Sequence, residues 1–436
     1  METWQVLSLL IGGLLVFLAM GFPIAFSFFL INIIGAYVVM GGVNGINLAV
    51  QQVFSSLVSF SIAPVPLFVF MGEVLLHSGL AKNTLNALDK WIGRLPGRLS
   101  LSVITGGCLF STLSGSTIAN TAMLGEIMVP EMRARGYRAP MVLGPIIGVG
   151  GLAMLIPPSS LAVIYASLAQ ISVGKVLMAG ALPGLLLAIF YSAYVVARCR
   201  LKPEIAPVYD IGHINLSDKV SDSVKHLLPL CLIFVLVLGV IFLGVATPTE
   251  AAAIGVTGAT ILTIAYGRFS ISVLKKSLTG TLQITVMVFM IIAASKTYSA
   301  ILAYSGATTQ LVGFVADIQM NRYIVLIGMV LIILLLGTFM EQVSMMMITI
   351  PIYMPVIMAL GFDPIWFAIL MLLNLEMAMS TPPFGILLFV MKGVAPEGTR
   401  MMDIVTAALP FLICDLIAMI ILILFPKIVT LLPSMM

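Results

Sequence analysis

The sequence "LSGSTIAN" (residues 113–120) interrupts a long apolar run with polar and small residues. Leu113 and Ile118 suit a membrane core, whereas the hydroxyls and the amide between them do not. These polar residues are Ser114, Ser116, Thr117 and Asn120, and they surround Gly115. Such a group either allows close packing of helices or holds a polar ligand. The sequence on both sides of this stretch favours one of these two interpretations.

The composition of the whole chain is that of a membrane protein. Of its 436 residues, 61% are hydrophobic and only 9% are charged, and the mean hydropathy is +1.18. A soluble protein would carry roughly 25% charged residues. Apolar runs of about 20 residues, the length of a membrane-spanning helix, recur from end to end. We therefore expect an all-α polytopic membrane protein that lies in the lipid bilayer of the bacterial inner (cytoplasmic) membrane.

Several other classes of protein are disfavoured. The first apolar run follows Glu2 without a basic segment, so no cleavable signal peptide is predicted. The net charge of +4 forms no polybasic arm, which argues against nucleic acid as a partner. The four cysteines and three histidines are scattered, so no structural metal site or disulfide scaffold is predicted. A Walker loop is missing as well, so the chain is not expected to hydrolyse ATP.

The chain contains an internal repeat at an offset of 225 residues. The segment "IMVPEMRARGYRAP" (127–140) aligns with "IYMPVIMALGFDP" (352–364), and "LIPPSSLAVIY" (155–165) aligns with "MSTPPFGILLF" (379–389). "MGFPIA" (20–25) similarly matches "VATPTEA" (245–251). Several proline matches in one order and at one spacing indicate two related halves. We assign residues 1–198 and 225–436 to the halves and residues 199–224 to a cytoplasmic linker.

The distribution of Lys and Arg predicts how the halves are oriented. Basic residues flank the apolar stretch around "LSGSTIAN" on both sides, at Arg98 and Arg133, and basic loops face the cytoplasm. A stretch with both ends inside cannot cross once, so residues 99–130 are predicted to form a re-entrant hairpin that turns near Gly115. The matching stretch, residues 323–360, has few basic flanks and is predicted to enter from outside. With about five spans plus one hairpin each, the halves are expected to have inverted topology.

The segment that precedes the first hairpin has two interpretations. "GLAKNTLNALDKWIGRLPGR" (79–98) spaces its leucines as a helix along the cytoplasmic surface does, among basic residues. An ordinary polar connector fits the same residues equally well.

Two pairs of prolines are expected to break helices at membrane depth. "IPPSS" (156–160) breaks at residues 157–158 and "TPPFG" (381–385) breaks at residues 382–383. Broken backbone survives there only when it is buried in protein or lines a wet cavity, and its carbonyls suit sodium. A plain proline kink is the alternative. The tip of the first hairpin would point its hydroxyls and Asn120 toward Pro157, unless these residues serve only helix packing.

Charged residues deep in the apolar sequence are further candidates. Glu250 stands near a predicted helix start, where it is expected to complement the helix dipole. Lys296 is the only base inside a predicted span and away from its ends. It either offsets the charge of an anionic substrate or pairs with a carboxylate such as Glu73 or Glu341.

At these motifs the chain resembles the large membrane subunit of tripartite ATP-independent periplasmic (TRAP) transporters, within the ion-transporter superfamily. The resemblance covers nearly the whole chain and is carried by "SGSTIANTAMLGEIMVPEMRARGY", "LIPPSSLAVIYASLAQISVGKVLMAGALPG", "ATPTEAAA" and "STPPFGILLFV". It implies an elevator-type importer of organic acids, coupled to inward sodium. It also implies two partners: a periplasmic substrate-binding protein and a small membrane subunit, which is expected to be a separate chain.

The resemblance further implies particular site residues. One sodium site would use Ser114, Ser116 and Asn120 with backbone near Ala153, Ile156 and Pro158. The symmetric site would use Ala378 and Thr381 with the second hairpin tip, where Glu341 is the nearest match to an aspartate of the family. Alanine stands at 153 and 378 where the family usually has glycine, which raises the question of backbone strain. Substrate is expected at Ser116, Ser159, Lys296 and Thr381.

We therefore expect a sodium-coupled secondary importer of a small organic anion (a carboxylate, sugar acid or sulfonate), with Na⁺ as the co-transported ion and no organic cofactor. The alternative is a stand-alone sodium–anion symporter or exchanger without a binding protein. An intramembrane hydrolase with Ser114 or Ser116 as nucleophile would need a base in the membrane. Only His77 lies in an apolar run, and no motif surrounds it, so the chain is not expected to be an enzyme.

Overall fold

The chain is all-helical in the part that the structure, a computed structural model, describes. The backbone is described for residues 3–93, 95–114, 116–207, 215–317, 320–338, 340–383 and 385–436, and the side chains for the same residues apart from 3, 81, 82, 112–114 and 315–317. Seven of the described helices are long and apolar enough to cross a membrane: Phe60–His77, Val173–Leu201, Leu216–Phe242, Pro248–Ala265, Ile271–Tyr304, Gln342–Ala359 and Met401–Leu424. Several shorter apolar helices accompany them.

The first half begins with outer helices and continues into a helical hairpin and a broken helix. The outer helices are α1 (Thr3–Leu7), η1 (Ser8–Gly12), α2 (Gly13–Ala19), α3 (Ile24–Val39), α4 (Val43–Leu57), η2 (Phe60–Ile62) and α5 (Pro64–His77). The remaining elements are α6 (Ala81–Ile92), α7 (Arg98–Ser114), α8 (Thr117–Ala134), α9 (Ala139–Gly151), η3 (Leu152–Met154), α10 (Ser160–Ala169), α11 (Val173–Leu201) and η4 (Pro203–Ile205).

The second half follows the same order of elements. Its outer helices are α12 (Leu216–Asp222), η5 (Ser223–Leu227), α13 (Leu228–Phe242), α14 (Pro248–Ala265) and α15 (Ile271–Tyr304). Then come α16 (Ala307–Asp317), α17 (Arg322–Gly337), α18 (Gln342–Ala359), α19 (Pro364–Ser380), α20 (Ile386–Val394), α21 (Met401–Leu424) and α22 (Lys427–Ser434). Helices α8 and α18 both start and end 225 residues apart, and so do α9 with α10 compared with α19 with α20. The long α15 stands where the first half has α4 and α5.

The segment that separates the halves is partly helical. Helix α11 extends to Leu201 and α12 starts at Leu216, so both enter the polar stretch 199–224. The segment before the first hairpin is helical as well, since α6 occupies Ala81–Ile92. It packs against α7 on one side and against α12 and η5 on the other.

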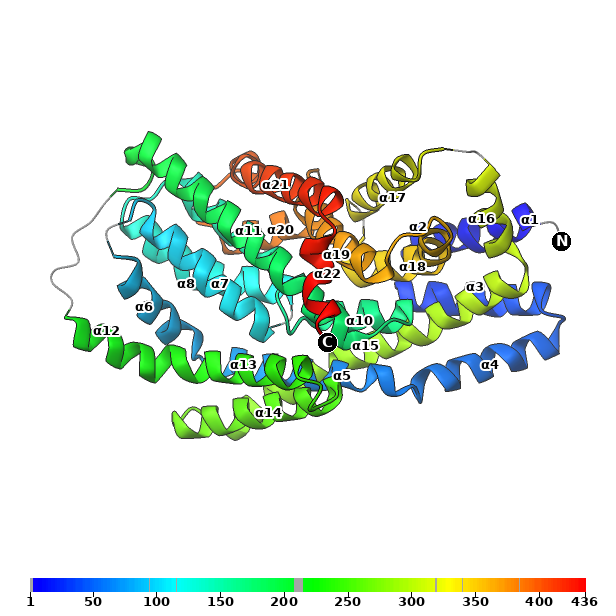
Figure 1. The fold of residues 1–436 in the computed structure, drawn as a ribbon, viewed down its shortest axis with the longest axis horizontal. Helices are drawn as coiled ribbons and strands as arrows, with labels where there is room; N and C mark the ends of the chain where they lie inside the picture. The colour runs from blue at the N-terminus through cyan, green and yellow to red at the C-terminus, as the bar shows by residue number, and fades with distance from the viewer. Residues whose placement is uncertain are drawn as a thin grey trace.

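The two hairpins lie on opposite sides of a buried centre. In Figure 1, α7 and α8 (cyan) lie to the left, α17 and α18 (yellow to orange) lie to the right, and α10 and α19 lie between them. Every residue of α19 from Trp366 to Ser380 is buried, as is every residue of α9 from Met141 to Gly151. Outer helices instead expose large apolar side chains, among them Phe54 of α4 and Val235 of α13. This distribution suits a polytopic protein whose outer helices face lipid.

Candidate functional site

The tip of the first hairpin is a short turn between α7 and α8. Helix α7 ends at Ser114 and α8 begins at Thr117, while Gly115 and the side chain of Ser114 lie outside the described residues. Ser116 is the N-cap of α8, and its hydroxyl oxygen accepts a hydrogen bond from the Ala119 amide at 3.3 Å. A serine suits this position because its oxygen satisfies a backbone donor that has no partner in the first helical turn.

Asn120 is fully buried one turn into α8 and is held by two neighbouring helices. Its amide nitrogen donates to the Ser111 hydroxyl of α7 at 2.8 Å and to the Val149 carbonyl of α9 at 3.4 Å. Its carbonyl oxygen, Oδ1, has no hydrogen-bond partner among the described residues. Buried amide oxygens nearly always have a partner in folded proteins. The Asn120 oxygen is therefore available to a ligand.

The helix that faces this tip is interrupted at its prolines. Helix α9 passes into a 3-10 turn that contains Ala153, and residues 155–159 are non-helical before α10 begins. The Pro157–Pro158 peptide bond is cis. Since prolines 157 and 158 carry no N–H, the carbonyls of Ala153 and Met154 lack their helical donors four residues later. Carbonyls at such a break can serve as ligands for a hard cation.

The other predicted residues at the first break lie close along the chain. The Ile156 amide donates to the Leu152 carbonyl at 2.9 Å, and Pro158 is buried. Ser159 is completely buried and caps α10, where its hydroxyl accepts from the Ala162 amide at 3.3 Å. Since α7 and α8 both contact the 3-10 turn that holds Ala153, the structure brings the first hairpin and the first break together.

The second break repeats this arrangement. Ala378 is buried near the end of α19, and its carbonyl accepts from the Thr381 amide at 3.3 Å. The Thr381 hydroxyl donates to the Met377 carbonyl at 2.6 Å, and the Pro382–Pro383 bond is cis. The hairpin packs closely here, because a Cβ added to Gly337 of α17 would overlap the Cβ of Ala378.

The alanines at positions 153 and 378 introduce no backbone strain. Among the described residues, Gln170 is the only non-glycine residue with a positive φ. Neither alanine therefore occupies the left-handed region in which glycine is favoured.

Glu341 and Glu250 both cap helices. The Glu341 carboxylate accepts from the Ser344 amide at 3.1 Å and from the Ser344 hydroxyl at 2.9 Å, at the start of α18. Glu250 forms a capping box with Thr247 at the start of α14, which confirms its predicted role at a helix start. The glutamate at the second hairpin tip is thus held by the first turn of its own helix.

Lys296 lies half-buried in α15 and has no carboxylate partner within the described part of the chain. Glu73, one of its two proposed partners, pairs with His77 at 3.1 Å. Glu341, the other, bonds to Ser344. Helix α15 contacts both α10 and α18, so Lys296 is on a helix that touches the first broken helix and the second hairpin.

Some buried polar groups of this region were missed in the sequence. Asp415 of α21 is 2% exposed and accepts a hydrogen bond from the Tyr191 hydroxyl. The hydroxyls of Thr117 and Thr121 are buried on α8 beside Asn120, without hydrogen-bond partners among the described residues. The acidic residue in "LICDLIAM" (412–419) was the sequence signal that could have identified Asp415.

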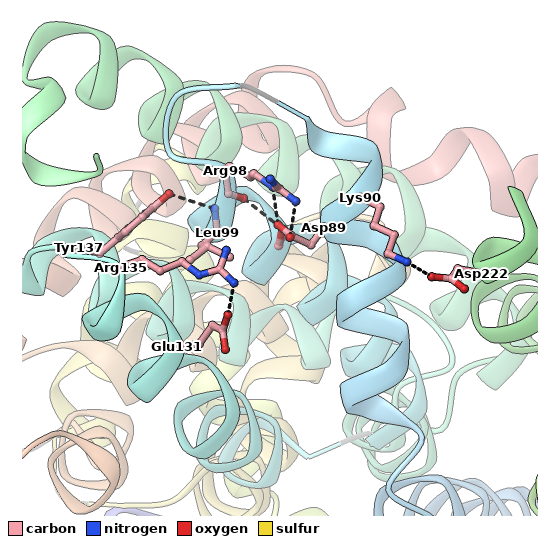
Figure 2. Close-up of polar contacts among 9 residues, drawn as sticks. Asp89, Lys90, Arg98, Leu99, Glu131, Arg135, Tyr137 and Asp222 are labelled. Carbon is pink, nitrogen blue, oxygen red and sulfur yellow. Dashed lines mark hydrogen bonds and ion pairs between the residues drawn. The ribbon is translucent and has the colours of Figure 1, made fainter. Parts of the chain in front are cut away.

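The base of the first hairpin is tied to α6 by charged residues (Figure 2). Arg98 pairs with Asp89 of α6, and Lys90 of α6 pairs with Asp222 of α12. The Trp91 indole also donates to the Ser223 hydroxyl at 2.5 Å. Helix α6 therefore connects the first hairpin to the start of the second half.

Two solved transporters have a similar fold at low sequence identity. The YdaH transporter of Alcanivorax borkumensis superposes with a TM-score of 0.65 and is 14% identical, and the match covers 88% of this chain and 90% of that one. MtrF of Neisseria gonorrhoeae superposes with a TM-score of 0.63 at 15% identity, covering 88% and 84% of the two chains.

Residues 11–428 match the family model described as the DctM component of tripartite ATP-independent periplasmic transporters. A C4-dicarboxylate TRAP large permease, DctM of Pseudomonas aeruginosa, is 31% identical over 88% of each chain. The sialic acid TRAP large permease SiaM of Vibrio cholerae is 30% identical over 98% of each chain. The isethionate TRAP permease DctMQ of Oleidesulfovibrio alaskensis is 31% identical over 89% of this chain and 60% of its own length. The chain therefore belongs to the DctM family of TRAP transporter large permeases and is a multi-pass membrane permease, not an enzyme.

Proposed function

We propose that this chain is the large permease of a sodium-coupled importer for a small organic anion in the bacterial inner membrane. It would receive its substrate from a periplasmic binding protein and work beside a small membrane subunit. Membership of the tripartite family supports both partners, and a relative named DctMQ supports the small one. Relatives are named for C4-dicarboxylates, sialic acid, isethionate and ectoine, so a carboxylate, sugar acid or sulfonate is the substrate class we favour.

The proposed movement is an elevator in which two inverted halves, residues 1–198 and 225–436, share one moving block. The hairpins and the broken helices would form the block, and the outer helices would form the scaffold. The repeated order of elements at an offset of 225 residues supports this division. Binding at a break between inverted halves is the usual arrangement in secondary transporters.

The observation that carries sodium coupling is the buried Asn120 oxygen without a described partner. It lies in a helix that packs against the broken segment, whose carbonyls at Ala153 and Met154 lack helical donors. We propose a first sodium site from Ser114, Ser116 and Asn120 with backbone at Ala153, Ile156 and Pro158. A symmetric second site would use Glu341, Ala378 and Thr381.

The substrate site we propose lies between the two breaks. Ser116, Ser159 and Thr381 would contact the solute, and Lys296 would offset its negative charge. The missing carboxylate partner of Lys296 among the described residues supports this role.

Uptake into liposomes tests the proposal. The permease is reconstituted with its small subunit and binding protein added singly and together, under an inward sodium gradient and with a choline gradient as control. We expect accumulation only with both partners and sodium present. Uptake by this chain alone would favour a stand-alone symporter, and uptake that ignores sodium would refute the coupling.

A further inference from the structure

Two carboxyl groups lie buried at the centre of the molecule, and neither is used by the proposed sites. Glu376 of α19 and Asp415 of α21 are each 2% exposed. An ionised carboxylate in the membrane interior is costly unless a partner compensates its charge. Each such residue therefore has to be explained by what neutralises it.

No basic side chain in the described part of the chain performs this task. Asp415 is the charged group that acts electrostatically on Glu376, and Asp415 itself receives only the Tyr191 hydroxyl. Helices packed against α19 carry their bases near their ends, and none of them pairs with either carboxyl: Lys175, Arg198 and Arg200 of α11, Arg322 of α17, Lys392 of α20 and Lys427 of α22. The remaining titratable groups on these helices are Cys199, Tyr165, Tyr194, Tyr323, Tyr353, Asp403 and Cys414, with Cys108 facing Glu376 from α7. The pair thus leaves negative charge without a protein counter-charge.

The position of Glu376 is set by two adjacent glycines at the end of α9. A Cβ added to Gly151 would overlap the Glu376 carboxyl, and one added to Gly150 would overlap the Thr121 hydroxyl. The missing side chains therefore allow a carboxylate and a hydroxyl to approach the same turn of helix. This turn lies directly before Ala153, where the predicted sodium ligands begin.

Oxygen atoms without partners gather at this turn. Glu376 Oε2, Asn120 Oδ1 and Thr121 Oγ1 are all buried and have no hydrogen-bond partner among the described residues. The C-terminal end of a helix also carries partial negative charge, and α9 ends at Gly151. Oxygen ligands with a net negative charge are what a hard cation requires.

We propose that Glu376, backed by Asp415, supplies the negative charge of a sodium site at the C-terminal end of α9. The carboxylate comes from the second half of the chain, whereas Asn120 and Thr121 come from the first. The first sodium site, whose other proposed ligands are all uncharged, would then draw its charge from across the repeat. This inference rests on the proposed sodium coupling and adds the residue that makes it electrostatically balanced.

Thermal unfolding of the purified full chain over a sodium series, at constant ionic strength with choline, tests this inference. For wild type we expect the melting temperature to rise with sodium. E376Q keeps the shape of the side chain but removes its charge, and we expect its sodium midpoint to rise at least about 10-fold, equivalent to ~1.4 kcal/mol. D415N should raise the midpoint less, since Asp415 lies behind Glu376. The matched control is E126Q, which makes the same change on the exposed side chain of Glu126 and should leave the midpoint unchanged.

A second variant keeps the charge and moves it. G151A adds a methyl group where the Glu376 carboxyl lies, so it should also raise the sodium midpoint. G328A is its control, because a Cβ at Gly328 meets nothing within 4 Å. This pair keeps the inference testable even where E376Q unfolds.

The outcomes separate this inference from the proposed function. A wild-type protein that ignores sodium would refute sodium coupling itself. A wild type that responds to sodium, with E376Q and G151A at the same midpoint, would overturn the role of Glu376 alone. An unchanged sodium midpoint in E376Q together with a lost pH dependence of melting would assign the carboxyl to a proton and overturn the inference as well.

Discussion

Asn120 uses both sides of its amide differently. The nitrogen is committed to Ser111 and Val149, which fixes the orientation of the group and directs the carbonyl oxygen away from both. The oxygen is then presented to a ligand without any rearrangement of the side chain. Such a fixed ligand loses little conformational entropy when it binds.

We predict that Asn120→Ala raises the sodium concentration for half-maximal uptake by at least about 10-fold. The variant should also lose ~1 kcal/mol of stability with its hydrogen bonds. Sodium-dependent uptake and thermal unfolding measure the two effects. Asn32→Ala is a matched control, because the Asn32 nitrogen donates to the Ala294 carbonyl at 2.7 Å and its oxygen also lacks a described partner. Equal shifts of the sodium requirement in both variants would contradict a specific role for Asn120.

For Lys296 we predict a change in substrate affinity. Lys296→Gln should raise the KM for the anion at least about 10-fold and leave the sodium requirement unchanged, because it removes only the charge that faces the solute. Uptake kinetics at saturating sodium measure this change. Lys275→Gln alters an exposed lysine of the same helix and should have no effect. An unchanged KM in Lys296→Gln would show that the lysine does not bind substrate.

Among the elements, helix caps explain part of what the sequence left open. Ser116, Ser159 and Glu341 were candidates for ligands because they are polar residues in apolar sequence. The structure places all three at N-caps, where each accepts a bond from its own helix. A cap and a ligand require the same polar oxygen next to the same helix start, so residue type alone does not distinguish them.

Breaks could be placed from the sequence more readily than contacts between the halves. Prolines act on the backbone locally, and the non-helical residues 155–159 and 381–385 follow from the missing donors at 157–158 and 382–383. Asp415 and the approach of Glu376 to Gly151 depend on how α9, α19 and α21 pack, which no local pattern encodes. The glycine pair at 150–151 would have been an ambiguous signal, since glycines in membrane helices usually serve close packing.

Helix α6 is the element whose contacts should change during transport. The Lys90–Asp222 pair joins it to α12, and the Thr84 hydroxyl, 1% exposed, donates to the His226 carbonyl at 3.2 Å. A partly exposed ion pair contributes about 0.2–1 kcal/mol. Losing it would therefore shift the population of this arrangement by up to about 5-fold.

We predict that Lys90→Glu increases the rate at which a maleimide labels Thr84→Cys by up to about 5-fold. The reversed pair, Lys90→Glu with Asp222→Lys, should restore slow labelling. The four native cysteines are replaced beforehand, and labelling is followed by mass shift. Arg400→Glu breaks the Arg400–Asp403 pair elsewhere and should not alter the rate. Failure of the reversed pair to restore protection would mean that Lys90 acts in another way.

At the scale of the whole molecule, inverted topology makes opposite demands on the bases of the two hairpins. The base of the first hairpin, at Glu131, should face the cytoplasm. The base of the second, at Met320, should face the periplasm. Both side chains are exposed in the structure.

We predict that a membrane-impermeant maleimide added to intact spheroplasts labels Met320→Cys and spares Glu131→Cys. Lysis should make both sites reactive. Labelling is measured in a chain whose native cysteines have been replaced, and the unsubstituted cysteine-free chain gives the background. Labelling of both sites before lysis would rule out the inverted arrangement.

The complete burial of α19 also constrains how this protein can vary. No residue from Trp366 to Ser380 reaches the surface, and α19 touches α9, α10 and α11 as well as its own half. Large-to-small changes in such a core cost about 2–5 kcal/mol, whereas surface changes usually stay within about 0.5 kcal/mol. Selection should therefore hold α19 nearly constant while the lipid-facing helices α4 and α13 drift. New substrates would then be acquired by changes around this helix, with the helix itself as the most slowly evolving part of the chain.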